Sequence, residues 1–100
     1  MLKRLAAVAV MLAAISGPAA AQDVVRLGNL KFAHYGAISY MKEIAAKYNL
    51  KIDEKQFAKG ADIYPAMAVD QIDIAASGAD GAVAARGNGV KLLVVAGFAN

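Results

Sequence analysis

The chain contains no cysteine, a single histidine and no cluster of basic residues. Without cysteine it can form neither a disulfide nor a lipoprotein anchor, so packing alone must stabilise the fold. The single histidine, His34, has no partner set for a metal centre or a catalytic triad, and a surface or packing role is its default. With 11 Lys and Arg residues against 8 Asp and Glu residues, the composition does not favour binding to nucleic acid or to an acidic membrane.

The first 21 residues have the features of a secretory signal peptide. Lys3 and Arg4 precede an apolar run from Leu5 to Ile15, and Ala19-Ala20-Ala21 forms a small-residue cleavage site. The run is shorter than the ~20 residues that a membrane-spanning helix needs, which favours cleavage over an uncleaved anchor. We expect a signal peptide at residues 1–21 and an exported mature chain, 22–100, with 9 basic and 8 acidic residues.

Hydrophobic periodicity in the mature chain predicts an alternation of strands and helices. Strands are expected at 24–27, 51–58, 72–76 and 90–96, and helices at about 36–48, 62–70 and 80–86. Gly28-Asn29 is interpreted as the turn that closes the first strand, and Asn49 as a left-handed helix cap with Leu50 packing back beyond it. The charged second strand is expected at a sheet edge. Right-handed crossovers then predict an α/β fold with a parallel sheet and flanking helices.

Several side chains have expected roles within these elements. Asp62 and Asp80 are interpreted as helix N-caps. Residues at helical spacing are expected in the hydrophobic core rather than against a cofactor, namely Tyr40, Met41, Tyr48 and Met67. Asp53 and Glu54 are neighbours on a strand and point to opposite faces, so they do not form a catalytic carboxylate pair. "GADG" and "GNG" match neither a dinucleotide fingerprint nor a phosphate loop.

Ligands of parallel α/β sheets bind outside the carboxyl ends of the strands. Three loops are expected there, at 28–36, 59–62 and 77–80. Ser77 and Gly78 have two interpretations, because small residues are common in ordinary strand-to-helix turns. In the functional interpretation, their backbone N–H groups and the Ser77 hydroxyl lie at the positive end of the third helix and donate to a polar or anionic ligand.

The segment "AMAVDQIDIAASGADGAVAARGNGVKLLVVAG" resembles part of the periplasmic solute-binding proteins of ABC importers, in the nitrate, sulfonate, taurine and thiamine-pyrimidine-precursor group. That group has a helix ending Ala-Leu-x-x-Gly, a strand with Ile-Asp, a Gly-containing loop and an Ala-rich helix. Ala66-Met67, Ile72-Asp73 and Ser77-Gly78 stand at those positions. Asp70 replaces the usual Gly at the helix end, where Asp can still adopt a left-handed conformation. The short connection "AAKYNLKID" also departs from many members.

The resemblance implies a solute-binding protein with a two-lobe, type II periplasmic-binding-protein fold. It covers only the opening part of that fold, so we expect residues 22–100 to be an incomplete first lobe, as a fragment or a truncated product, that binds solute weakly or not at all. The expected ligand is a small anionic or polar organic solute such as a sulfonate, nitrate or a pyrimidine. The resemblance implies that seven residues line the ligand cleft: Phe32, His34, Tyr35, Gly60, Ala61, Ser77 and Gly78.

By the same resemblance the protein is expected to be a periplasmic monomer that delivers its solute to an inner-membrane ABC permease. We expect no enzymatic activity, cofactor, metal or nucleic-acid partner. Two alternatives stay open. One is an enzyme like the pyrimidine-precursor synthase of the same fold, which the export signal and the lack of cysteine disfavour. The other is the ligand-sensing domain of a membrane receptor, which would need a transmembrane segment downstream.

Overall fold

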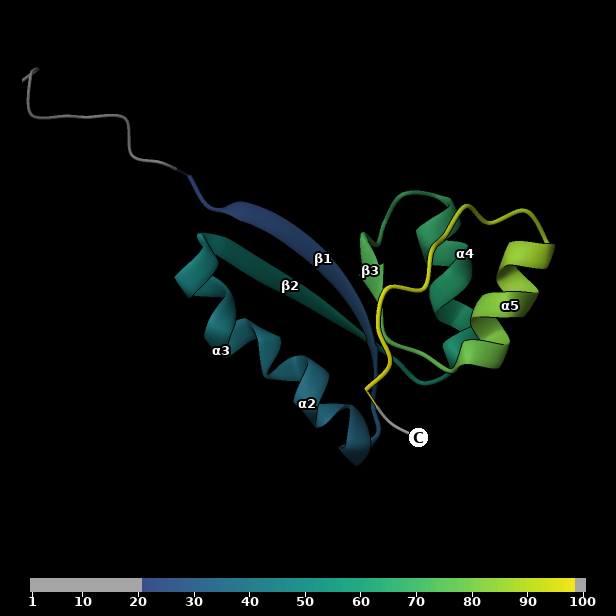
Figure 1. Cartoon of the computed structure of the whole chain (residues 1–100), viewed down its shortest axis with the longest axis horizontal. Helices are drawn as coiled ribbons and strands as arrows, with labels where there is room; N and C mark the ends of the chain where they lie inside the picture. The colour runs from purple at the N-terminus through teal and green to yellow at the C-terminus, as the bar shows by residue number, and fades with distance from the viewer. Residues whose placement is uncertain (1–20, 99–100) are drawn as a thin grey trace, which may run out of the picture.

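The computed structural model describes residues 21–98, so the expected signal peptide lies outside the described residues except for Ala21. Among residues 21–98, no helix is both long and apolar enough to cross a membrane. These residues form an α/β domain in which helices flank a three-stranded parallel sheet (Figure 1). The expected fold class is therefore confirmed at the level of a parallel sheet with flanking helices.

The sheet has the order β2-β1-β3, with β1 in the centre. β1 (Asp23–Leu30) pairs with β2 (Leu50–Phe57) along its whole length, and with β3 (Ile74–Ala75) only at Leu27 and Gly28. The edge position predicted for the charged second strand is confirmed. β1 is longer than predicted, and the predicted turn at Gly28-Asn29 is wrong. Pairing with β2 and tight packing keep both residues extended and buried.

The first helical segment is less regular than the single amphipathic helix that was predicted. It consists of a 3-10 turn (Ala33–Tyr35), α2 (Gly36–Ser39), α3 (Met41–Ala45) and a second 3-10 turn (Ala46–Tyr48). α3 packs along β2, and only its inner side is covered. The prediction that Tyr40 and Tyr48 lie in the core is therefore wrong, since they are 62% and 72% exposed. Met41 and Met67 are half-buried.

Two left-handed residues end helical segments as their side chains predict. Asn49 has φ 56°, and its N–H donates to the carbonyl of Ala46, which confirms the predicted cap. Leu50 is the first residue of β2 and is half-buried. Asp70 has φ 61° after the short helix α4 (Ile63–Ala68). Asn and Asp tolerate this conformation better than most residues.

Of the two predicted aspartate N-caps, Asp62 takes the position without the capping hydrogen bond, and Asp80 does not take the position. Asp62 precedes α4 at the end of the 3-10 turn Gly60–Asp62, and its side chain makes no capping hydrogen bond. In α5 (Ala79–Gly87) the N-cap is Gly78 rather than Asp80. Gly78 is extended, with φ −66° and ψ 143°, so the helix begins one residue earlier than predicted and Asp80 lies inside the first turn.

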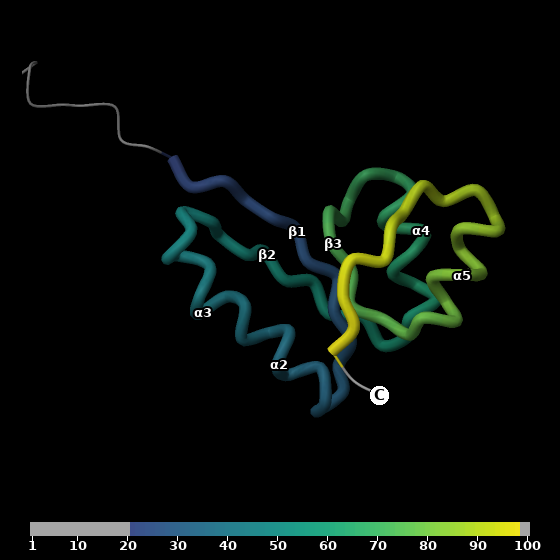
Figure 2. The backbone as a smooth tube through the Cα atoms, viewed as in Figure 1, coloured from purple at the N-terminus to yellow at the C-terminus, as the bar shows by residue number. Residues whose placement is uncertain are grey.

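The predicted fourth strand, residues 90–96, is wrong: the segment is extended but belongs to no sheet within residues 21–98. Its beginning is tied to α5, because Val90 N–H donates to Ala85 and the Arg86 side chain donates to the carbonyl of Leu92. The segment then passes beside β3 (Figure 2, yellow). Val95 is 80% exposed. The predicted strand 72–76 is also shorter in the structure, where β3 covers only Ile74–Ala75 and pairs with β1 at Leu27 and Gly28.

Two small apolar clusters hold these elements together. The first joins β1, the first loop, α4 and the residue after β3 through Leu30, Tyr35, Ile63 and Ala76. The second joins α4 to α5 through Tyr64, Ala82 and Ala85, with Val90 and Leu92 packed against it. The first cluster lies directly beneath the carboxyl edge of the sheet, so it fixes the loops that emerge there.

Candidate functional site

Three loops meet at the carboxyl edge of the sheet, as the strand order predicts. Lys31 N–H donates to the carbonyl of Phe57 at 3.2 Å, which joins the loop after β1 to the loop after β2. Ala76 N–H donates to the carbonyl of Gly28 at 2.9 Å, which fixes the loop after β3. β2 lies on one side of β1 and β3 lies on the other, so the strand order reverses at β1. In parallel α/β sheets, such a reversal leaves a crevice between the neighbouring loops.

Gly60 lets the second and third loops approach closely. A Cβ atom at this position would collide with the Oγ atom of Ser77. The absence of a side chain at Gly60 thus brings two of the predicted site segments into contact. Gly60 itself is half-buried and Ala61 is exposed, and neither lines the hollow described below. Their contribution is the position of Ser77.

Ser77 and Gly78 lie where β3 gives way to α5. Gly78 is the helix N-cap and forms no side-chain cap, so the first-turn N–H groups face the carboxyl edge without a capping side chain. The hydroxyl of Tyr64 donates to the carbonyl of Gly78 at 3.2 Å and orients this turn. The carboxylate of Asp80 lies close to Gly78 and brings negative charge to the helix start. This arrangement suits a polar hydrogen-bonding group better than a bare anion.

The three predicted aromatic residues form one cluster but occupy different environments. The rings of Phe32 and His34 are stacked with centroids 5.9 Å apart, and those of His34 and Tyr35 are 4.5 Å apart. Tyr35 is buried in the first apolar cluster, whereas Phe32 is 52% exposed. Phe98 packs edge-on against Tyr35 at 5.2 Å. Tyr35 therefore serves chiefly as a core residue, and His34 is the exposed ring next to it.

A hollow of about 1450 Å³ lies between the segment 90–98 and the rest of the domain. It exceeds the ~300–1,000 Å³ of typical ligand pockets because the segment passes over it without pairing. Of the predicted site residues, it brings together His34, Tyr35, Ser77 and Gly78, and leaves out Phe32, Gly60 and Ala61. Tyr64, Phe98 and Asn29 also lie at this edge and were not predicted from the sequence. Tyr64 could have been found from its position in the first turn of the helix after the second loop.

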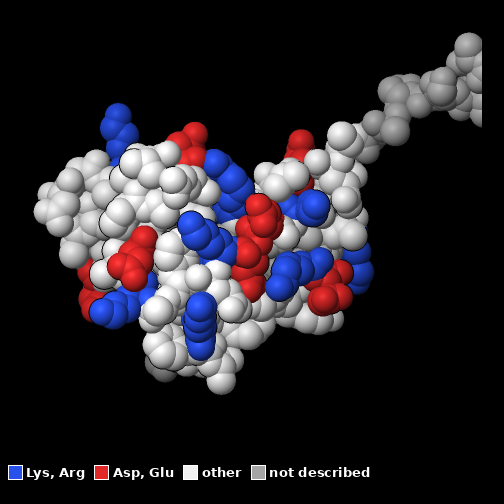
Figure 3. All heavy atoms as spheres, turned by 180° about the vertical axis from the view of Figure 1, so that it is seen from behind, with Lys and Arg blue, Asp and Glu red and all other residues white. Residues whose placement is uncertain are grey.

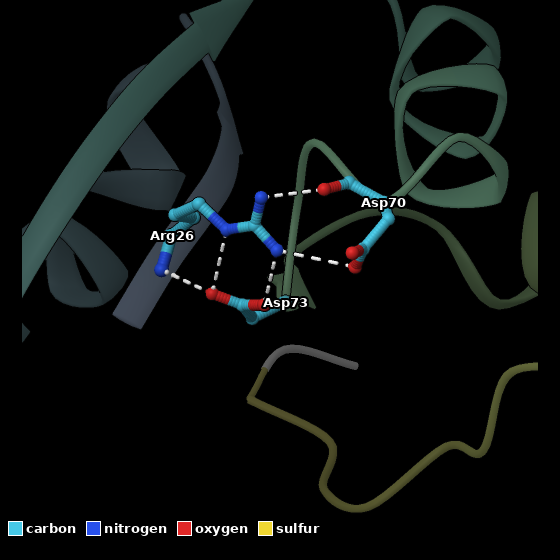
Figure 4. A network of polar contacts seen from close by, with 3 residues as sticks. All are labelled: Arg26, Asp70 and Asp73. Carbon is cyan, nitrogen blue, oxygen red and sulfur yellow. Dashed lines mark hydrogen bonds and ion pairs between the residues drawn. The ribbon is translucent and has the colours of Figure 1, made fainter. Parts of the chain in front are cut away.

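A separate polar network lies nearer the amino end of the sheet (Figure 4). The Arg26 guanidinium pairs with Asp73 at 2.7 Å and with Asp70 at 3.2 Å, and it also donates to the Asp70 carbonyl. The side-chain hydrogen bond from Arg26 lowers the pKa of Asp73 from 3.8 to about 2. Since Arg26 is on β1 and both aspartates lie just before β3, the network anchors that short strand to the sheet.

The charged groups elsewhere are mixed in sign. Lys and Arg side chains lie beside Asp and Glu side chains over the face shown in Figure 3, and neither sign dominates it. Comparison of the chain with family models, with curated proteins and with solved structures found no match.

Proposed function

We propose that the protein is the solute-binding component of an ABC importer, which captures a small anionic or polar organic solute in the periplasm. The observation that carries this proposal is the meeting of three loops at the carboxyl edge of a parallel sheet, where Ser77 and Gly78 open α5 beside a hollow. Small residues there let a solute approach backbone N–H groups. The position of Asp80 favours a polar organic solute over nitrate.

In this proposal, binding requires no covalent chemistry. The first-turn N–H groups of α5 and the Ser77 hydroxyl donate to the solute, and the rings of His34 and Tyr35 line the hollow as an aromatic wall. A type II binding protein has a second lobe that closes over the first, and the permease recognises the closed form. The described residues supply one wall, so we expect their own affinity to be low, in the millimolar range that corresponds to about 4 kcal/mol.

The experiment is a titration of isotope-labelled protein with sulfonates, nitrate and pyrimidines at millimolar concentration, followed by amide chemical shifts in NMR. We expect saturable shifts at Ser77, Gly78 and Ala79 with at least one solute. Ser77→Ala should weaken binding several-fold, because a neutral hydrogen bond contributes about 0.5–1.5 kcal/mol.

Asn88→Ala, at the opposite end of α5, is the matched control and should leave the affinity unchanged. Saturable shifts confined to other parts of the domain, with none at Ser77, Gly78 and Ala79, would refute the proposed site.

A further inference from the structure

Asn29 is a fully buried amide at the carboxyl end of β1, with 0% of its surface exposed. Burying an amide is unfavourable unless its donors and acceptor all find partners. The neighbouring buried positions on this strand, Leu27 and Leu30, are apolar. Asn29 therefore occupies a core position that an apolar residue would fill with less cost, which points to a role for its hydrogen bonds.

Those hydrogen bonds all hold the first loop. Leu30 N–H donates to Oδ1 of Asn29 at 3.0 Å, and because this N–H can only donate, the amide oxygen must face it. The Nδ2 group therefore faces the other way and donates to the Tyr35 carbonyl at 3.3 Å and to Ser39 Oγ at 3.1 Å. One side chain thus joins the start of the loop to its end and to α2.

A buried carboxylate supports this cluster from β2. The side chain of Glu54 is 6% exposed, with Lys42 Nζ 3.7 Å from Oε2 and Gln56 donating to Oε1 at 3.1 Å. Burial acts to raise the pKa of Glu54, but the nearby Ser39 hydroxyl, the Lys42 ammonium and the amides of Gln56 and Asn29 together lower it. An ionised Glu54 beside this cluster favours nearby hydrogen-bond donors, and its Oε2 atom is buried without a hydrogen-bond partner.

We propose that Asn29 is a positioning residue for the solute site. It holds residues 31–35 in the conformation that places His34 and Tyr35 against the hollow, and it acts through the Tyr35 carbonyl and Ser39 rather than by touching solute. The role of the hollow as a solute site rests on the proposed function, whereas the effect of Asn29 on the conformation of residues 31–35 does not.

Hydrogen–deuterium exchange of the full chain without solute tests the loop. Asn29→Asp keeps the shape of the side chain but turns a carboxylate oxygen toward the Tyr35 carbonyl. We expect exchange in peptides spanning 31–40 to become about tenfold faster or more, as for local opening after loss of a buried hydrogen bond. Ser39→Ala, which removes one acceptor, should give a smaller increase in the same peptides and keeps the test valid if the Asn29 variant fails to fold.

Arg26→Ala is the matched control, because it removes polar contacts on the same strand, three residues before Asn29, that face Asp70 and Asp73 rather than the first loop. It should leave exchange in 31–40 unchanged relative to the rest of the domain. The ring resonances of His34 should shift in Asn29→Asp and Ser39→Ala but not in the control. Uniformly faster exchange across residues 21–98, or unaltered exchange in 31–40, would overturn the proposal.

The solute titration separates this inference from the proposed function. If solute binds at Ser77 and Gly78, Asn29→Asp and Ser39→Ala should both weaken that binding several-fold. Ser77→Ala should leave hydrogen exchange in residues 31–40 unchanged. If solute binds elsewhere on the unsubstituted protein, the proposed site fails, and the exchange result alone decides the role of Asn29. Unweakened binding in a variant with a loosened loop would overturn the positioning role.

Discussion

Gly28 was predicted to lie in a turn but lies inside β1, and its contacts explain the difference. A Cβ atom there would lie 3.1 Å from Ile63 Cγ2 and 3.3 Å from Ile72 Cγ2. The glycine thus allows α4 and the segment before β3 to pack closely on β1. Its neighbour Asn29 completes the strand end with a buried amide. Both residues favour turns in isolation, and only their neighbours show their role here.

Gly28→Ala should destabilise the domain because the added methyl group overpacks this contact. We expect the free energy of unfolding to fall by about 1–3 kcal/mol, measured by urea denaturation. Gly36→Ala is the control: Gly36 is helical and a Cβ there meets nothing within 4 Å. It should stabilise the protein by about 0.4–1 kcal/mol. Equal effects of the two substitutions would contradict the packing described.

Asp73 gives a prediction on pH. Its pKa is about 2 in the folded protein and ordinarily 3.8, owing first to the side-chain hydrogen bond from Arg26. A carboxylate whose pKa is lower in the folded state stabilises the fold at pH values above its unfolded pKa. This stabilisation is lost as the pH falls from about 4 through 2. Asp73→Asn should lower stability at pH 7 and flatten its dependence on pH over that window.

The measurement is the urea midpoint at several pH values. Asp53→Asn, at an exposed position on β2, is the control and should keep the steep loss of stability in acid. Parallel pH profiles of the Asp73 variant and the unsubstituted protein would show that the ion pair does not anchor β3.

At the scale of elements, hydrophobic periodicity located the helices better than it located the strands. Helical spacing identified the region of α2 and α3, and the composition of β2 predicted its edge position. The apolar run at 90–96 suggested a buried strand, yet it makes no ladder within residues 21–98. Apolarity predicts that a segment would gain from burial, whereas pairing requires a partner strand in register.

Val95→Lys tests the placement of that segment. Because Val95 is 80% exposed, the substitution should change the free energy of unfolding by less than about 0.5 kcal/mol. Ile63→Ala, at a fully buried position, should cost about 2–5 kcal/mol and serves as the reference. Chemical denaturation measures both. A loss of several kcal/mol in Val95→Lys would mean that residues 90–96 are packed as a strand after all.

At the scale of the whole molecule, the site could be predicted only in part. The expectation that three loops meet at the carboxyl edge follows from the alternation of strands and helices, and the contacts between Lys31 and Phe57 and between Gly28 and Ala76 agree with it. Which residues face the hollow could not be read from spacing. His34 and Ser77 line it, whereas Phe32 and Ala61 do not, because loop conformation directs their side chains.

The sequence by itself determined the α/β class, the edge position of β2 and the left-handed residues Asn49 and Asp70. Each of these follows from periodicity, charge or the backbone preference of one residue, which are local properties. Only the tertiary structure decided that Gly28 and Asn29 lie inside a strand and that residues 90–96 stay unpaired within the described chain. Those outcomes depend on contacts between segments far apart in the sequence, where packing and pairing override local preference.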